Sequence, residues 1–239
     1  MQQRLPPQLA APIAFAHRGA RAFAPENTIE AFALGLKMGA TGLESDVWIT
    51  ADGVPVLDHD GIVKRTLGKG KPIAGFQRSE LPAHIPSLVD LIEQCGDDYH
   101  LSLDLKDPHS GQGVINAVRE IAPAMLERLW LCSPVWESLL PLRGQGVKLV
   151  DSTRLQRIKE GAERRASVLM SNGIDAINLH HSDWSGGLVV LFHRFDRIAF
   201  GWDMQEEHIL ERALLMGLDG VYSDYPDRMM QAYRAHMTS

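Results

Sequence analysis

The sequence has little of what three large classes of protein depend on. Its two cysteines, Cys95 and Cys132, have no metal-type spacing and predict reduced, buried thiols without a structural disulfide. No apolar run approaches the roughly 18 residues that a bilayer-crossing helix needs. No cluster of lysine and arginine accompanies the net charge of −6. We therefore expect neither stable membrane association nor a nucleic acid partner.

Linkers and targeting signals are also missing. No Gly/Ser-rich or Pro-rich stretch divides the 239 residues, of which 45% are apolar, so one large core is possible. The stretch from Leu9 to Ala16 is short and contains Pro12, which is unlike a secretion signal. These features predict a single domain over residues 1–239 and a cytoplasmic location.

Short β-rich runs alternate with longer helical patterns along the chain, which is typical of repeated βα units and a parallel sheet. Eight such units predict a closed (β/α)8 barrel of the TIM type. A doubly wound sheet is the alternative, and it is disfavoured because no Gly-x-Gly-x-x-Gly turn follows the first strand. The expected strands are Ile13–His17, Gly42–Ile49 (extended by Val54–His59), Leu101–Lys106, Trp130–Ser133, Lys148–Asp151, Ala176–His180, Ile198–Asp203 and Gly220–Ser223. The expected helices are Thr28–Met38, Ser87–Cys95, Gly113–Ile121, Glu137–Arg143, Leu155–Asn172, Gly186–Phe195, Glu206–Met216 and Asp227–His236.

Acidic residues interrupt two of these strands. Glu44 and Asp46 share one face of their strand because side chains alternate, and Asp104 lies at the corresponding end of the next strand. Uncompensated carboxylates would cost several kcal/mol each in a barrel interior. Three oxygen ligands predict one hard divalent cation, Mg²⁺ or Ca²⁺, with Mn²⁺ also possible. The alternative is a structural network in which Arg18, Arg65 or Lys106 neutralises the three acids.

Polar residues at the other strand ends predict the remaining chemistry, because barrel enzymes react at the carboxyl ends of their strands. His17 and His59 flank the acids and are predicted to carry protons, with Asp58 or Asp60 fixing the tautomer of His59. Six further histidines are predicted to be solvated or structural: His84, His100, His109, His193, His208 and His236. The predicted substrate contacts are Arg18, Lys106, His180 and Trp202. Of these, Arg18 and Lys106 carry positive charge that attracts a phosphate.

An ordered series of motifs resembles the glycerophosphodiester phosphodiesterase family. The elements follow one another over about fifty residues: His17-Arg18-Gly19, Pro25-Glu26-Asn27-Thr28, Glu44-Ser45-Asp46, His59-Asp60 and Arg65-Thr66. Looser matches continue through Asp104-Leu105-Lys106, Trp202 and the segment 217–226.

The resemblance implies a TIM-type barrel that uses a divalent cation to hydrolyse glycerophosphodiesters to glycerol 3-phosphate and an alcohol. It implies Glu44, Asp46 and Asp104 as metal ligands, His17 and His59 as the acid–base pair, and Arg18 and Lys106 as phosphate contacts. The chain departs from the family in having Asp104 where Glu is usual, Asp203-Met204-Gln205 after Trp202, and a short segment from Gly61 to Pro86. A lysophospholipase D, another small phosphodiester hydrolase and an inactive phosphodiester-binding barrel remain alternatives.

Overall fold

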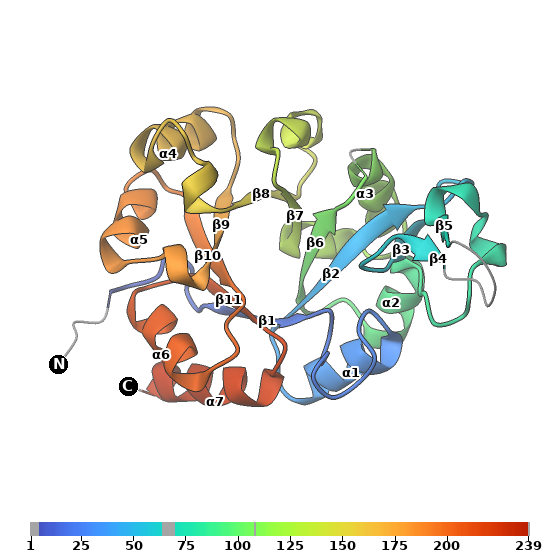
Figure 1. Cartoon of the computed structure of the whole chain (residues 1–239), viewed down its shortest axis with the longest axis horizontal. Helices are drawn as coiled ribbons and strands as arrows, with labels where there is room; N and C mark the ends of the chain where they lie inside the picture. The colour runs from blue at the N-terminus through green and yellow to red at the C-terminus, as the bar shows by residue number, and fades with distance from the viewer. Residues whose placement is uncertain (1–4, 64–69, 108, 239) are drawn as a thin grey trace.

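Eight parallel strands close into a barrel (Figure 1). The structure is a computed structural model that describes residues 5–63, 70–107 and 109–238. The strands run in the order β1-β11-β10-β9-β8-β7-β6-β2, and β1 pairs with both β11 and β2, which closes the ring. The predicted barrel is thus confirmed and the doubly wound alternative is wrong. The barrel strands are β1 (Ile13–His17), β2 (Gly42–Ile49), β6 (His100–Leu105), β7 (Leu129–Ser133), β8 (Lys148–Thr153), β9 (Ala176–His180), β10 (Ile198–Trp202) and β11 (Gly220–Ser223).

Helices follow the strands and cover the outside of the barrel. Thr28 begins the first of them by accepting a hydrogen bond from the backbone N–H of Ala31, as an N-cap residue does. Gly39, Gly96, Gly173 and Gly217 all have positive φ at helix ends, as their placement predicts. The α-helices are α1 (Ile29–Lys37), α2 (Leu88–Cys95), α3 (Ser110–Ile121), α4 (Ala162–Ser171), α5 (Gly186–His193), α6 (Glu207–Leu215) and α7 (Pro226–Thr238).

Two predicted helices differ from the structure. The segment expected to be helical over Glu137–Arg143 is the 3₁₀ helix η4 (Trp136–Leu142), because Pro141 lies inside it and cannot donate a backbone hydrogen bond. The long helix expected over Leu155–Asn172 is divided into η5 (Leu155–Arg157) and α4. Gly161, with φ of 89°, precedes α4 and breaks the continuity. The other short 3₁₀ segments are η1 (Ile73–Gly75), η2 (Arg78–Glu80), η3 (Pro123–Arg128) and η6 (His181–Asp183).

The interior of the barrel is apolar in its lower part, toward the amino ends of the strands, and polar in its upper part, toward their carboxyl ends. Phe15 stacks on Tyr222 with ring centroids 4.4 Å apart, and Phe200 meets Trp130 edge to face at 4.8 Å. These rings fill the lower part of the barrel together with smaller apolar side chains. A larger apolar core lies between the strands and the surrounding helices. The acidic side chains of the cavity lie above these rings, toward the carboxyl ends of the strands.

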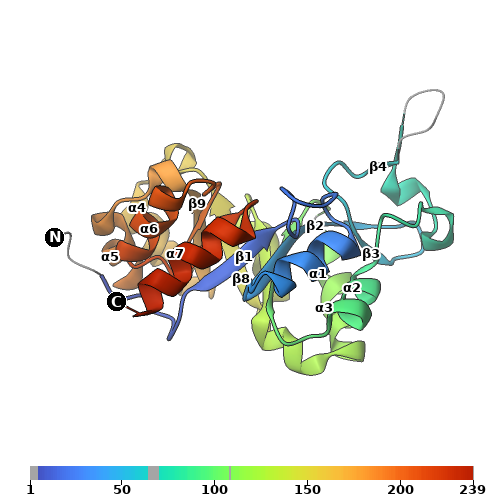
Figure 2. The same cartoon turned by 90° about the horizontal axis from the view of Figure 1, so that it is seen from below.

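A small extension stands beside the barrel between β2 and α2. It contains β3 (Pro55–Leu57), antiparallel to β2, and the hairpin of β4 (Ile62–Val63) and β5 (Lys71–Pro72). Figure 2 shows the hairpin projecting at the side of the barrel, away from α5. A small core around Ile73 holds the extension together. Among the helices of the described residues, none is long and apolar enough to cross a bilayer.

Candidate active site

A cavity of about 650 Å³ opens at the carboxyl ends of the barrel strands. Every one of the eight strands contributes to its lining. None of the described residues between Gly61 and Pro86 lines the cavity. The location is the one at which barrel enzymes carry out their chemistry.

The three predicted metal ligands lie together at one side of the cavity. Asp46 and Asp104 are direct neighbours in the β2–β6 register. Glu44, Asp46 and Asp104 each offer a carboxylate oxygen, and these oxygens lie within 4.8 Å of one another. The shorter side chain of Asp104 therefore still reaches the group.

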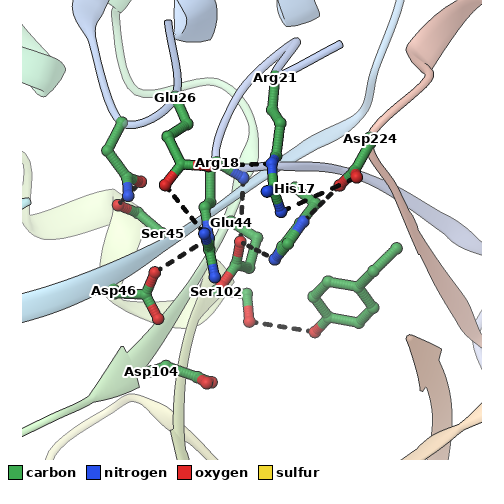
Figure 3. A network of polar contacts seen from close by, with 12 residues as sticks. His17, Arg18, Arg21, Glu26, Glu44, Ser45, Asp46, Ser102, Asp104 and Asp224 are labelled. Carbon is green, nitrogen blue, oxygen red and sulfur yellow. Dashed lines mark hydrogen bonds and ion pairs between the residues drawn. The ribbon is translucent and has the colours of Figure 1, made fainter. Parts of the chain in front are cut away.

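Two cations, Lys106 and Arg18, neutralise part of this acidic group, and Figure 3 shows Arg18 beside Asp46. Lys106 Nζ lies 2.8 Å from Asp46 Oδ1 and 3.4 Å from Asp104 Oδ2. Arg18 Nε lies 3.2 Å from Asp46 Oδ2. Lys106 and Arg18 thus form the charge network that the sequence left open as an alternative, whereas Arg65 and Thr66 lie outside the described residues.

The network leaves the site suited to a hard divalent cation. Oδ2 of Asp46 is buried and accepts no hydrogen bond, even though the Arg18 guanidinium is near. The linked ion pairs contain more carboxylates than cations, even when His17 is protonated: Glu26, Glu44, Asp46, Asp104 and Asp224 against His17, Arg18, Arg21 and Lys106. A divalent cation would balance this excess and take Asp46 Oδ2, which accepts no hydrogen bond, as a ligand. The donor set fits Mg²⁺, Ca²⁺ or Mn²⁺.

The pKa values of the acids reflect their burial. Burial, with the charges of Asp46 and Asp104 in addition, raises the pKa of Glu44 to about 7 against an ordinary 4.5, while His17 opposes the shift. Burial also raises the pKa of Asp104, although Lys106 works against it. Close carboxylates thus resist full ionisation here, and a bound divalent charge would reverse that tendency.

His17 connects this group to the last strand of the barrel. Its Nδ1 lies 2.5 Å from Asp224 Oδ1, and its Nε2 lies 3.6 Å from Glu44 Oε2. Burial by itself lowers the pKa of His17, but Glu44 and the hydrogen bond to Asp224 outweigh it and raise the pKa. A proton held on Nδ1 by Asp224 leaves Nε2 directed into the cavity.

The loop after β1 holds Arg18 in place. Arg18 and Gly19 have φ of 51° and 78°, so the chain turns sharply, and Arg18 N–H donates to Glu44 Oε2 at 3.0 Å. Glu26 accepts from Arg18 Nη1 at 3.0 Å. Asn27 accepts from Ser45 Oγ at 2.7 Å, which fastens the loop to β2. The motif 25–28 thus acts as a support for Arg18.

His59 lies apart from this cluster. It follows β3, and its Nδ1 lies 2.9 Å from Asp60 Oδ1. Asp58 instead accepts from the backbone N–H of Gly61 at 2.7 Å. Of the two carboxylates considered for fixing the ring, Asp60 is therefore the partner. The His59 side chain is 43% exposed and does not line the cavity.

His180 and Trp202, the other predicted substrate contacts, lie on the opposite wall. Trp202 lines the cavity and meets His180 edge to face at 4.6 Å. His180 does not line the cavity. Its Nδ1 accepts from Ser182 N–H at 3.2 Å, and its Nε2 lies 3.1 Å from Asp203 Oδ2. His180, His181 and Asp203 could also group around an ion, but both ring nitrogens of His180 already have protein partners. His180 is a support for Asp203 in this structure.

Several residues of the cavity were not predicted from the sequence. Asp224 was placed at the end of its strand, but nothing local indicated its pairing with His17. Glu26 belongs to a recognised motif, yet its role in holding Arg18 depends on the turn. Arg154 and Arg157 follow β8 and line the far wall. Their position after a barrel strand was the only available signal.

Comparison with known proteins gives a consistent result. Residues 17–107 match the family model described as "Glycerophosphoryl diester phosphodiesterase family". A glycerophosphodiester phosphodiesterase of Caldanaerobacter subterraneus subsp. tengcongensis is 28% identical over 248 residues, with coverage of 93% of this chain and 98% of that protein. Glycerophosphodiester phosphodiesterase 1 of Mus musculus is 42% identical over 98 residues, which cover 34% of this chain and 30% of the mouse protein.

Solved structures show the same architecture. A Silicibacter pomeroyi protein, provisionally described as a glycerophosphoryl diester phosphodiesterase, superposes with a TM-score of 0.83 at 26% identity. The match covers 96% of this chain and 95% of that one. The barrel architecture is therefore shared along nearly the whole chain, whereas the match to the family model covers residues 17–107.

Proposed function

We propose that this chain is a member of the glycerophosphodiester phosphodiesterase family and that it hydrolyses glycerophosphodiesters to glycerol 3-phosphate and an alcohol in the barrel cavity. One observation carries the proposal: the acids Glu44, Asp46 and Asp104 share one side of the cavity with His17 and with two cations. Water is consumed, the P–O bond to the alcohol breaks, and the alcohol leaves with a proton.

Glu44, Asp46 and Asp104 would hold the cation. When bound, a divalent ion supplies positive charge that stabilises the phosphate oxygens as the transition state forms. Arg18 and Lys106 add fixed positive charge at the same edge of the cavity. Glu26 holds Arg18 from behind, so its guanidinium is positioned before the substrate arrives.

His17 is the proposed proton carrier at Nε2. Asp224 accepts the Nδ1 proton and so selects the tautomer whose Nε2 lone pair can take a proton from the nucleophile. The same ring, once charged, is stabilised by Asp224 and Glu44. The nucleophile is water or the neighbouring glycerol hydroxyl.

His59 is proposed as the partner of His17 in proton transfer. It lies one residue beyond Asp58, whose N–H donates to the carbonyl of the metal ligand Asp46 at 3.1 Å. To act, its exposed ring must turn from Asp60 toward the substrate. Which histidine serves as acid and which as base is left open by this arrangement.

A coupled assay for glycerol 3-phosphate tests the proposal directly. Glycerophosphocholine, glycerophosphoethanolamine, glycerophosphoglycerol and a lysophospholipid are compared with Mg²⁺ and Ca²⁺ supplied separately. We expect glycerol 3-phosphate to be released from at least one soluble diester, to stop with EDTA, and to return when the ion is restored. Release from none of the diesters would contradict the function, and full activity after exhaustive metal removal would contradict the metal dependence.

A further inference from the structure

We infer that the leaving alcohol of the preferred diester is a hydroxylated, negatively charged group rather than a quaternary ammonium alcohol. This inference rests on the proposed function and concerns the wall of the cavity opposite His17. Four strand-to-strand steps separate β8 from β1 in either direction around the ring. Figure 1 shows β8 and β1 facing each other across the barrel. Residues that follow β8 therefore meet a part of the substrate that lies away from His17.

This far wall carries two arginines, of which Arg154 is paired with Asp183 and Arg157 is not. Arg154 and Arg157 both line the cavity after β8. Arg154 Nε donates to Asp183 Oδ2 at 2.9 Å, which fixes its guanidinium. Arg157 is exposed, and within the described part of the chain its guanidinium has no ion-pair or hydrogen-bond partner. An anionic ligand would give Arg157 the partner that the protein does not supply.

The same wall is unsuited to a quaternary ammonium group. Such cations bind over open aromatic faces, but the guanidinium of Arg154 lies 5.7 Å from the ring centroid of Trp202. Asp203 is the carboxylate on this wall, and both of its oxygens are engaged. Oδ2 faces His180 Nε2 at 3.1 Å, and Oδ1 accepts from Gln205 Nε2 at 3.1 Å.

A buried amide indicates hydroxyl groups on the ligand. Asn178 is 4% exposed and lines the cavity, and its Oδ1 accepts no hydrogen bond. Its Nδ2 donates only a long bond of 3.4 Å, to Ser152 Oγ. An unsatisfied buried acceptor costs about 1–3 kcal/mol unless a donor reaches it. A hydroxyl of a polyol alcohol would supply that donor.

The glycerol half of the substrate could supply a hydroxyl to Asn178, but it does not explain the free guanidinium of Arg157. Glycerol carries no charge beyond the phosphate, which the proposed function places beside Glu44, Asp46 and Asp104. A free guanidinium on the far wall therefore has a use only if the alcohol is anionic. The fitting class is a phosphorylated polyol, such as an inositol phosphate, linked through the diester.

The test compares glycerophosphoinositol 4-phosphate with glycerophosphocholine. We expect kcat/KM to be at least roughly tenfold higher for the inositol phosphate diester, with most of the difference in KM. Arg157→Gln should lower kcat/KM for that diester about tenfold and raise it about twofold for glycerophosphocholine, because a repelling charge is removed. Arg164→Gln is the matched control, since Arg164 is an exposed arginine on α4 that does not line the cavity.

Calorimetry with inositol 4-phosphate, the expected leaving alcohol, does not depend on turnover. Arg157→Gln should weaken its binding about tenfold, and Arg164→Gln should leave it unchanged. Equal or faster turnover of glycerophosphocholine, or equal effects of the two arginine variants, would overturn the inference. Release of glycerol 3-phosphate from no diester would contradict the proposed function and with it the inference, whereas turnover of the diesters without any dependence on Arg157 would overturn the inference alone.

Discussion

The imidazole of His17 donates from Nδ1 to Oδ1 of Asp224 across 2.5 Å, although the two residues are 207 positions apart in the chain. They meet because β1 and β11 are adjacent parallel strands and both residues follow the paired segment. The hydrogen bond and the charge of His17 lower the pKa of Asp224 despite its partial burial. The pair holds the ring in one tautomer and orientation.

Asp224→Asn should therefore lower kcat by about 10- to 100-fold with little change in KM, since Asp224 positions the proton carrier. The melting temperature should stay close to that of the wild type. In a His17→Ala background the same change should have almost no further effect on kcat, because the group it positions is gone. Asp227→Asn, an exposed carboxylate on α7, is the control. Full additivity of the two losses would contradict this role.

His59→Ala should lower kcat by roughly two to four orders of magnitude and leave the fold intact, as expected for a proton carrier. His17→Ala should have an effect of similar size. The control is His84→Ala, because His84 is exposed in a loop away from the cavity. Circular dichroism checks the fold of each variant. Near-wild-type turnover of His59→Ala would show that its exposed position beside Asp60 is also its working position.

Asp46→Asn should weaken binding of a divalent cation by at least about 100-fold, because it removes a ligand whose Oδ2 has no other hydrogen bond. Titration calorimetry with Mg²⁺, Ca²⁺ and Mn²⁺ measures this without reference to turnover. Glu120→Gln, on the exposed face of α3, makes the same change in charge outside the cavity. Unaltered ion affinity in Asp46→Asn would instead favour the purely structural network with Lys106 and Arg18.

Gly19→Ala should destabilise the protein more than Gly53→Ala. Both glycines have positive φ, of 78° and 83°, so each substitution costs about 1–2 kcal/mol in backbone strain. At Gly19 a Cβ would also come within 2.5 Å of the Ala31 carbonyl carbon, whereas at Gly53 no atom lies within 4 Å. Urea unfolding should show an additional loss of about 2 kcal/mol for Gly19→Ala. Equal losses would mean that the turn can relax.

Because of Asp151, the free energy of unfolding should fall as the pH rises from about 4 to about 6. Burial raises its pKa from 3.8 to about 6 in the folded protein, against the opposing charge of Arg165. In that window the unfolded chain has lost the proton that the folded chain retains, so the free energy of unfolding decreases as pH rises. The decrease is about 3 kcal/mol and is complete above pH 6.

Urea unfolding of Asp151→Asn from pH 4 to pH 7 isolates this contribution. The wild type should lose about 3 kcal/mol relative to the variant over that range. Glu163→Gln, at an exposed position of α4, should follow the wild type at every pH. A constant difference between wild type and Asp151→Asn would show that Asp151 is ionised throughout.

The sequence determined the barrel and the acidic group. Alternation of strand and helix patterns identifies eight βα units, and the two-residue period of a strand places Glu44 and Asp46 on one face without knowledge of the neighbours. Glycines at helix ends are equally local, since positive φ is a property of the single residue. Two residues could have corrected the expected helices Glu137–Arg143 and Leu155–Asn172. Pro141 and Gly161 each act through the backbone of their own segment, so both signals are local.

Tertiary structure alone decided how the cavity is assembled. Asp224 reaches His17 only because the last strand closes onto the first, and Arg154 and Arg157 stand opposite His17 only because β8 lies across the ring from β1. Such partners depend on distances between segments far apart in the chain, which local periodicity does not encode. The sequence specifies each strand end and its side chains, whereas ring closure determines which of them share one cavity.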